Sequence, residues 1–332
     1  MNPQISVIIC THNPRADYLK RVLDALNVQT LPKEQWELLL VDNASKEKLA
    51  TKLDLSWHPH ARHIREDELG LTAARCRGII ESKWDGLVFV DDDNVLAPDY
   101  LICASKLLES HTWVGAFGGN IVGEFETEPE GWANIAIPYL AIRVINQEKW
   151  ALSSDLKLND YLPCGAGMVI RKGVASYYMK LLAETPLRRG LDRKGTSLIS
   201  SGDFDMAFCA CALGLAVGQF PQLQLRHLIP SGRLKRDYLL RLAENVAFSN
   251  TCLRFIWTGK LADQNQKNLC RSDKIYELYK ILRSRLRGQT PSFDDEFKAA
   301  LEQGNGRATE MLRSHRSAPI AIAKSQDHPN NH

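Results

Sequence analysis

The chain has 332 residues, of which 44% are apolar and 24% are charged. This mixture is typical of a globular protein with a substantial core and excludes a fibrous or disordered chain. The net charge of +3 is too small to indicate nucleic-acid binding, and we expect no nucleic-acid partner. The charge is uneven, because residues 231–332 carry 18 basic and 11 acidic groups whereas residues 1–230 carry 24 and 28. This division favours a metal-using catalytic part joined to a part that meets anions.

The cysteines and apolar stretches indicate a cytoplasmic protein. Eight cysteines are scattered without a CxxC pair, and the first residues show no basic-then-apolar signal pattern. We therefore expect reduced thiols. The longest apolar stretch, residues 206–218, is too short to cross a bilayer, so no membrane-spanning segment is expected.

Strand and helix patterns alternate along most of the chain. The β-branched run at residues 5–10 predicts a strand buried on both faces, followed by a helix with Asn13 as its N-cap. Further strands are predicted at residues 38–41, 87–90, 164–170 and 215–220, and further helices at residues 72–82, 98–110, 173–184 and 203–213. This order predicts an α/β fold with a mostly parallel central sheet flanked by helices.

The remaining segments define the expected domains. Residues 118–160 break any period and predict loops with small strands. Helices are predicted at residues 234–257, 272–286 and 294–312. We expect a catalytic domain at residues 1–230, a helical C-terminal extension at 231–313 and a disordered tail at 314–332.

Polar side chains follow three of the predicted strands. Thr11 and Asn13 follow the first, Asp42 ends the second, and residues 91–93 (three aspartates) end the third. In a parallel sheet, ligands bind beyond the carboxyl ends of the strands. Three crowded aspartates repel one another unless a hard cation neutralises them, which predicts Mg²⁺ or Mn²⁺ as cofactor. The alternative is an acidic turn that only caps the next helix.

Five segments, in this order, resemble the family 2 glycosyltransferases, which are inverting enzymes of the GT-A fold. They read ISVIICTHN, LLLVDNAS, LGLTAARCRGI, FVDDDN and SGDFDMA, and the resemblance covers roughly residues 4–230. It implies transfer of a sugar, with inversion, from a nucleotide-diphosphate sugar to an acceptor hydroxyl. A UDP-sugar donor, a saccharide or lipid-linked acceptor, and a role in polysaccharide or lipopolysaccharide biosynthesis are the family-level expectations.

The resemblance also implies roles for individual residues. Asp91 and Asp93 match the family's DxD pair, with Asp93 as the metal ligand, and Asp203 matches the general base. The nucleotide would be bound by Thr11, Asn13, Asp42, Gly70, Ala74, Arg75, Asp91 and Asp92.

Some positions depart from the family's motifs. The pattern NxGxxxARN has Glu68 in place of its first Asn and Cys76 in place of its last, and GEDxD has Gly202 in place of Glu. Both aspartates of the second motif remain. The departures put the nucleotide preference and acceptor contacts in doubt.

Several further residues are candidates with open alternatives. His227 is either a further metal ligand, which would join Asp91 and Asp93, or a hydrogen-bonded surface histidine. Arg233 is the candidate for pairing with the diphosphate. Asp205 either contacts the acceptor or only stabilises the first turn of a helix. Trp132 either stacks on a sugar or packs in the core, and Gly165 lies either in the floor of the donor and acceptor site or in a tight turn.

The C-terminal helices carry apolar residues beside basic ones. Such a face either makes peripheral contact with the inner membrane surface or packs on the catalytic domain, and we favour packing. 

Other classes of protein explain fewer residues. A phosphatase of the haloacid-dehalogenase type also needs Mg²⁺ and fits Asp91, Asp93 and Val95, but leaves Thr11 and Asp42 without purpose. A sugar nucleotidyltransferase and a dinucleotide-dependent oxidoreductase lack their glycine-rich loops. A non-catalytic binding protein of the transferase fold does not require all three of Asp91, Asp93 and Asp203.

Overall fold

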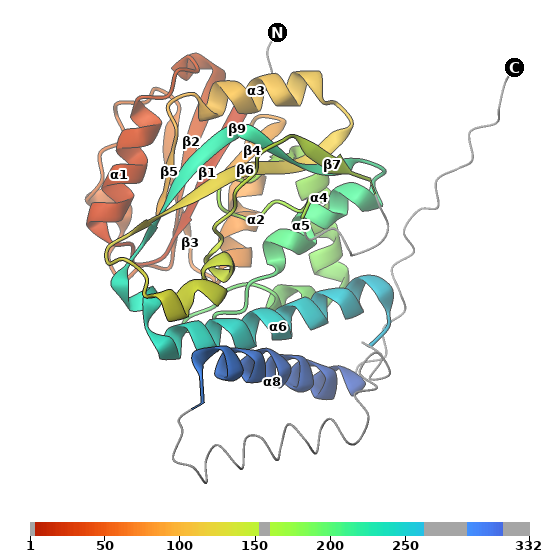
Figure 1. Cartoon of the computed structure of the whole chain (residues 1–332). Helices are drawn as coiled ribbons and strands as arrows, with labels where there is room; N and C mark the ends of the chain where they lie inside the picture. Colours follow the sequence, from red (N-terminus) through yellow and green to blue (C-terminus); the bar gives the residue numbers. More distant parts are fainter. Residues whose placement is uncertain (1–3, 153–159, 262–290, 315–332) are drawn as a thin grey trace, which may run out of the picture.

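The structure is a computed structural model that describes residues 4–152, 160–261 and 291–314. A nine-stranded sheet lies at its centre, and helices cover both faces (Figure 1). The strand order runs from β3 (Ala61–Glu66) through β2 (Trp36–Asn43), β1 (Ile5–Thr11), β4 (Gly86–Asp91), β8 (Val169–Arg171), β6 (Val114–Phe125) and β9 (Ala216–Ile229) to β5 (Asn94–Leu96), with β7 (Lys149–Ala151) paired to β9.

The long strands of the sheet run in the same direction, and three short strands oppose them. β3, β2, β1 and β4 are parallel to one another, as predicted, and β6 is parallel to β9. The short strands β5, β7 and β8 pair antiparallel with their neighbours. β8 is antiparallel to both β4 and β6, so β6 and β9 run in the same direction as β1–β4. The α/β fold class and the mostly parallel sheet are confirmed, and the three short opposed strands make the sheet mixed.

Alternation along β1 explains why both faces of the sheet are covered. Ile5, Val7 and Ile9 pack in a core that includes α1 (Ala16–Asn27) and α3 (Tyr100–Ser110). Ile8 and Cys10 pack in a second core on the opposite face, formed by the helices α2 (Leu71–Glu81), α4 (Lys172–Glu184) and α5 (Gly202–Ala212). A strand with apolar residues at every position requires such two-sided burial.

One local prediction near a strand end was wrong. α1 begins at Ala16 with Arg15 as its N-cap, so Asn13 does not cap it. Asn13 has φ 48° and instead links the ends of β1 and β2, because its N–H donates to the Ser45 hydroxyl and its side-chain oxygen accepts from the Lys46 N–H. Asparagine tolerates this left-handed conformation better than most residues.

Long strands replace part of the predicted loops. β6 continues to Phe125, inside the segment predicted as irregular, because it pairs along its length with β9. β9 itself is 14 residues long, well beyond the predicted end at residue 220. The strand predicted at residues 164–170 is confined to β8, and Met168 instead donates its N–H to the Gly165 carbonyl in a turn.

The C-terminal helices pack on the catalytic part. α6 (Arg236–Thr258) and α8 (Phe293–Arg313) lie side by side below α5 in Figure 1. Phe255, Ile256 and Trp257 of α6 belong to the same core as the sheet, which supports packing over membrane contact for this helix. Within the described ranges no helix is long and apolar enough to cross a bilayer. The predicted helix at 272–286 and the tail at 315–332 lie outside the described residues, and the domain division stays a prediction.

A test of this packing uses Gly304, where α8 crosses α6. A Cβ added at Gly304 would lie 2.0 Å from the carbonyl oxygen of Glu244, so Gly304→Ala forces the helices apart. We expect a loss of about 1–3 kcal/mol in the free energy of unfolding, measured by urea denaturation. The control is Gly306→Ala in the same helix, which meets nothing within 4 Å and should gain about 0.5–1 kcal/mol. Equal stability of both variants would contradict the close crossing.

Candidate active site

The ends of three parallel strands meet at one edge of the sheet. Thr11 lies opposite Asp42 in the pairing of β1 with β2, and Cys10 lies opposite Asp91 in the pairing of β1 with β4. The Thr11 hydroxyl donates to Asp92 across this edge. The strand register therefore gathers the polar residues that follow the strands, as the sequence predicted.

The aspartates at residues 91–93 form a tight turn. The side-chain oxygen of Asn94 accepts from the Asp91 N–H at 3.1 Å, and its amide donates to Asp93 at 3.0 Å. Burial, and then the charge of Asp93, raise the pKa of Asp91 and raise that of Asp92 to about 7. Asp91 and Asp92 are therefore harder to ionise than free aspartates. The contribution of Asp93 to this effect is the repulsion expected from three adjacent aspartates.

The pairing of β5 with β9 brings His227 to Asp93. Asn94 lies opposite His227 in the register, and the Leu228 N–H donates to the Asp93 carbonyl at 2.8 Å. The His227 Nε2 lies 3.4 Å from the Asp93 Oδ2, and its Nδ1 lies 2.9 Å from the Leu140 carbonyl oxygen. His227 is buried, which excludes the surface-histidine interpretation.

Arg233 lies against both of these groups. Its guanidinium is 3.0 Å from the Asp93 Oδ2 and 3.1 Å from the His227 Nε2. A guanidinium only donates, so the His227 Nε2 accepts and the Nδ1 carries the proton toward Leu140. Burial alone would raise the pKa of Asp93, but His227 in its protonated form and the charge of Arg233 lower it.

This arrangement fits a divalent cation. A histidine that donates one ring N–H to a backbone carbonyl presents its other nitrogen as a ligand, and the Asp93 carboxylate faces the same point. Among the described residues no three His, Cys, Asp or Glu side chains gather closely enough to hold a metal alone. A site with few protein ligands is usual for Mg²⁺, which takes further ligands from substrate phosphates and water.

Asp203, the predicted base, lies in the first turn of α5 and is buried. Its carboxylate accepts the Gly165 N–H at 2.6 Å and the Phe204 N–H at 2.8 Å. Gly165 therefore contacts Asp203 and also lies in a turn before β8, and its place in the floor of the donor and acceptor site stays a prediction. Burial raises the pKa of Asp203, Arg75 opposes this, and Asp192 adds to it.

Arg75 connects Asp203 with the acidic turn. Its side chain is 4% exposed, and its favourable charge interactions are with Asp192, Asp203 and Asp91, in decreasing order. The charges of Asp91 and Asp203 thus both interact with one buried guanidinium. The Arg75 side chain points into the protein and pairs with Asp192, and its predicted role in binding the nucleotide stays a prediction.

Two other residues predicted to bind the nucleotide, Ala74 and Gly70, also make contacts within the protein. Ala74 is 1% exposed and packs in the core beneath α2, so its side chain is not available to a nucleotide. Gly70 is the N-cap of α2, and its N–H donates to the side chain of Asn43 at 2.8 Å. Asn43 also donates to the Glu68 carbonyl at 2.7 Å. Sequence reasoning missed this role of Asn43, although it follows Asp42 directly.

Asp42 is already well supplied with donors. It accepts the N–H groups of Ser45 and Leu49, each at 3.1 Å, and the Arg65 guanidinium at 2.9 Å. Burial would raise the pKa of Asp42, but these hydrogen bonds lower it. The Oδ1 atom accepts only the Ser45 N–H among these bonds, so an acceptor position remains for a base, and that contact stays a prediction.

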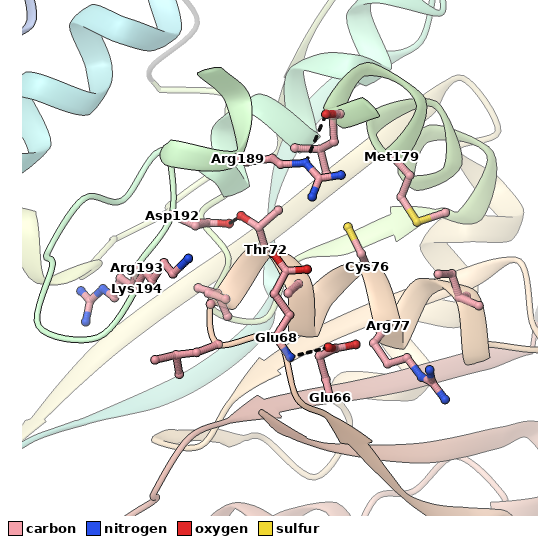
Figure 2. A pocket seen from close by; sticks show the side chains of 16 residues that line it. Glu66, Glu68, Thr72, Cys76, Arg77, Met179, Arg189, Asp192, Arg193 and Lys194 are labelled. Atoms are coloured by element: carbon pink, nitrogen blue, oxygen red, sulfur yellow. Dashed lines mark hydrogen bonds between the residues drawn. The ribbon is translucent and has the colours of Figure 1, made fainter. Parts of the chain in front are cut away.

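A cavity of about 560 Å³ opens beside the N-terminal end of α2 (Figure 2). Asp192 and Thr72 point toward one another at its inner wall, and Arg189, Arg193 and Lys194 line it from the segment after α4. Asp192 was not among the predicted residues. It lies in a stretch without strand or helix periodicity, and no motif marks it.

Two of the candidates for acceptor contact have partners inside the protein. Asp205 is fully buried, pairs with the fully buried Arg188, and accepts the Trp257 indole N–H at 2.7 Å. The structure therefore supports the helix-stabilising interpretation of Asp205. Trp132 lies at the surface end of a smaller core, where its ring meets that of Phe293 edge-on and its N–H donates to Glu130. Its stacking on a sugar stays a prediction.

The site lies at the carboxyl ends of parallel strands in an α/β fold, and it combines strand-end carboxylates with the buried Asp203. This arrangement is typical of a transferase. Residues 6–175 match the family model described as glycosyl transferase family 2, which is half of the chain, and the chain belongs to this family. This membership confirms the resemblance and overturns the phosphatase alternative.

Individual proteins agree with the family. The chain is 33% identical over 132 residues to the glycosyltransferase AglE of Haloferax volcanii, covering 39% of this chain and 42% of that protein. It is 29% identical over 111 residues to YwdF of Bacillus subtilis, an uncharacterized glycosyltransferase, covering 33% and 40%. The chain thus matches about two fifths of the length of these relatives. The crystal structure of S. aureus TarS shares the fold, with a TM-score of 0.50 and 13% identity over 93% of this chain and 55% of TarS.

The buried pair of Asp205 and Arg188 can be tested by stability. Asp205→Ala leaves the Arg188 charge without its partner, and we expect a loss of about 3–5 kcal/mol in the free energy of unfolding by urea denaturation. The control is Asp24→Ala, which removes an exposed pair with Lys20 and should cost less than about 1 kcal/mol. Undiminished stability with lost activity would instead assign Asp205 to the acceptor.

Proposed function

We propose that this protein is an inverting, metal-dependent glycosyltransferase that moves a sugar from a nucleotide-diphosphate sugar to an acceptor hydroxyl. The observation that supports the proposal is that a group suited to a cation and a separate carboxylate lie on either side of one buried arginine, Arg75. Asp93, His227 and Arg233 form a group suited to a cation and a diphosphate, and Asp203 is a separate carboxylate beyond Arg75. Transfer with inversion needs these two functions, one for the leaving group and one for the attacking hydroxyl.

Asp93 and His227 would hold the cation, with Asp91 beside them. A bound Mg²⁺ or Mn²⁺ supplies positive charge where negative charge builds on the departing diphosphate. With a cation held by Asp93 and His227, the Arg233 guanidinium, which now contacts both of these residues, would be placed to pair with phosphate oxygens. This fits its predicted diphosphate role.

Asp203 is oriented for proton transfer by the backbone. The N–H groups of Gly165 and Phe204 hold its two oxygens in place, and the remaining lone pairs are available to an acceptor hydroxyl. Its burial excludes bulk water from the base, which favours attack by a sugar hydroxyl over hydrolysis. Thr11 and Asp42 are proposed to contact the nucleotide, and uracil is the proposed base.

The family supports a proposal for the acceptor, and the cysteine pattern supports one for the location. We propose a saccharide or lipid-linked acceptor in polysaccharide or lipopolysaccharide biosynthesis, and a cytoplasmic location. Peripheral membrane contact is the less favoured part of this proposal, since Leu239, Leu242 and the end of α6 are buried inside the protein.

The separation of roles predicts two different losses. Asp93→Ala should abolish the rise in melting temperature that a UDP-sugar with Mn²⁺ produces, because ligand binding raises the melting temperature by mass action. Asp203→Asn should retain that rise and lose transfer, measured as UDP release in the presence of acceptor. A variant at either position with full transfer activity would defeat the assignment.

The environment of Asp203 predicts the acid limb of the pH profile. The base acts only when ionised, and burial with the nearby Asp192 raises its pKa while Arg75 lowers it. Activity should therefore fall, as the pH is lowered, at a pH above the ordinary aspartate pKa of about 3.9. The measurement is kcat/KM against pH at saturating metal, with donor binding over the same range as the control. A limb at or below the ordinary value would contradict a buried base.

A further inference from the structure

A carboxylate occupies the space in front of Gly202. A Cβ added at Gly202 would lie 2.4 Å from both the carboxyl carbon and the Oδ2 of Asp192. Position 202 is where the GEDxD pattern has its glutamate. The chain thus lacks a carboxylate at this position and brings one to the same place from a segment ten residues earlier.

Asp192 joins the first turns of two helices. Its Oδ2 accepts the Thr72 hydroxyl at 2.9 Å, and both oxygens lie 3.2 Å from the Arg75 Nη1 (Figure 2 shows Asp192 directed at Thr72). The Leu191 carbonyl accepts the N–H groups of Ser201 and Gly202 at the start of α5. The segment that carries Asp192 is therefore fixed to both α2 and α5.

The other end of the Arg75 guanidinium faces the base. A Cβ at Gly165 would lie 2.4 Å from the Arg75 Nη2 and 3.4 Å from the Asp203 Oδ2, so the three groups share one small space. Asp192 holds Nη1 on the opposite side. Without Asp192 this buried cation would turn to Asp203 as its nearest remaining partner and occupy the lone pairs needed for the acceptor hydroxyl.

We propose that Asp192 is a positioning residue that replaces the missing carboxylate at position 202 and holds Arg75 away from a direct pair with Asp203. The inference rests on the proposed function, since it assigns Asp203 as the base. Asp192 itself touches neither donor nor acceptor. Its effect passes through Arg75, and it should appear in kcat rather than in donor binding.

The experiment removes the carboxylate at position 192 and restores one at position 202. Asp192→Ala should lower kcat by about 10- to 100-fold with the donor KM within about twofold, the size usual for a residue that orients another. Gly202→Glu alone should also lower kcat, because its side chain collides with Asp192. The double variant Asp192→Ala with Gly202→Glu should recover most of the lost kcat.

A neutral partner separates charge from volume. Asp192→Ala with Gly202→Gln fills the same space without a carboxylate and should not recover kcat. Equal recovery by Gln and Glu would overturn the proposal, since packing alone would then explain the effect. Should Asp192→Ala not fold, Asp192→Asn keeps the volume and should show the same loss of kcat, and full kcat in that variant overturns the proposal as well.

The matched control is another buried carboxylate paired with an arginine. Glu37 is 2% exposed at its side chain and lies at the opposite end of β2 from Asp42, where it pairs with Arg62. Glu37→Gln should lower stability and leave kcat unchanged. Wild-type protein without transfer activity toward any nucleotide sugar would refute the proposed function. Active wild type with undiminished kcat in Asp192→Ala would refute only the role of Asp192.

Discussion

One buried arginine, Arg75, balances the charges of the carboxylates in this site. Arg75 lies among Asp91, Asp192 and Asp203, which come from a strand end, a loop and a helix that are distant in sequence. A buried guanidinium without partners would destabilise the fold by several kcal/mol, and so would buried carboxylates without a cation. Each of these groups is therefore tolerated only because the others are present. Through this balance, the charge of Arg75 links the predicted base, Asp203, with Asp91 in the predicted metal site.

The second constraint is the register of the sheet. The parallel strands β1, β2 and β4 bring Thr11, Asp42 and Asp91 to one edge, whereas the antiparallel pair of β5 and β9 brings His227 to Asp93. A shift of one residue in the second pairing would turn His227 to the other face of the sheet and away from the acidic turn. The proposed metal site thus depends on a three-residue strand as much as on the aspartates.

The limits of prediction from sequence follow from the range of the interactions. β1, β2 and β4 were predictable, because an apolar run buried on both faces leaves a local pattern, and the gathering of Thr11, Asp42 and Asp91 at their ends follows from parallel strand geometry. β5 has only three residues, and β6 and β9 are long because they pair with each other, which no local pattern records. The inward direction of Arg75 likewise depends on Asp192, 117 residues away.

Gly202 shows what a departure from a motif can mean. Read along the chain, a glycine in place of glutamate removes one negative charge from the site. In three dimensions the absent side chain leaves room that the carboxylate of Asp192 fills at a distance no Cβ would allow. Under the proposed role of Asp192, the charge next to Arg75 comes from residue 192 and not from position 202. Because the electrostatic balance around a buried arginine constrains where charges lie and not which segment supplies them, a motif can lose a residue and keep its physical function.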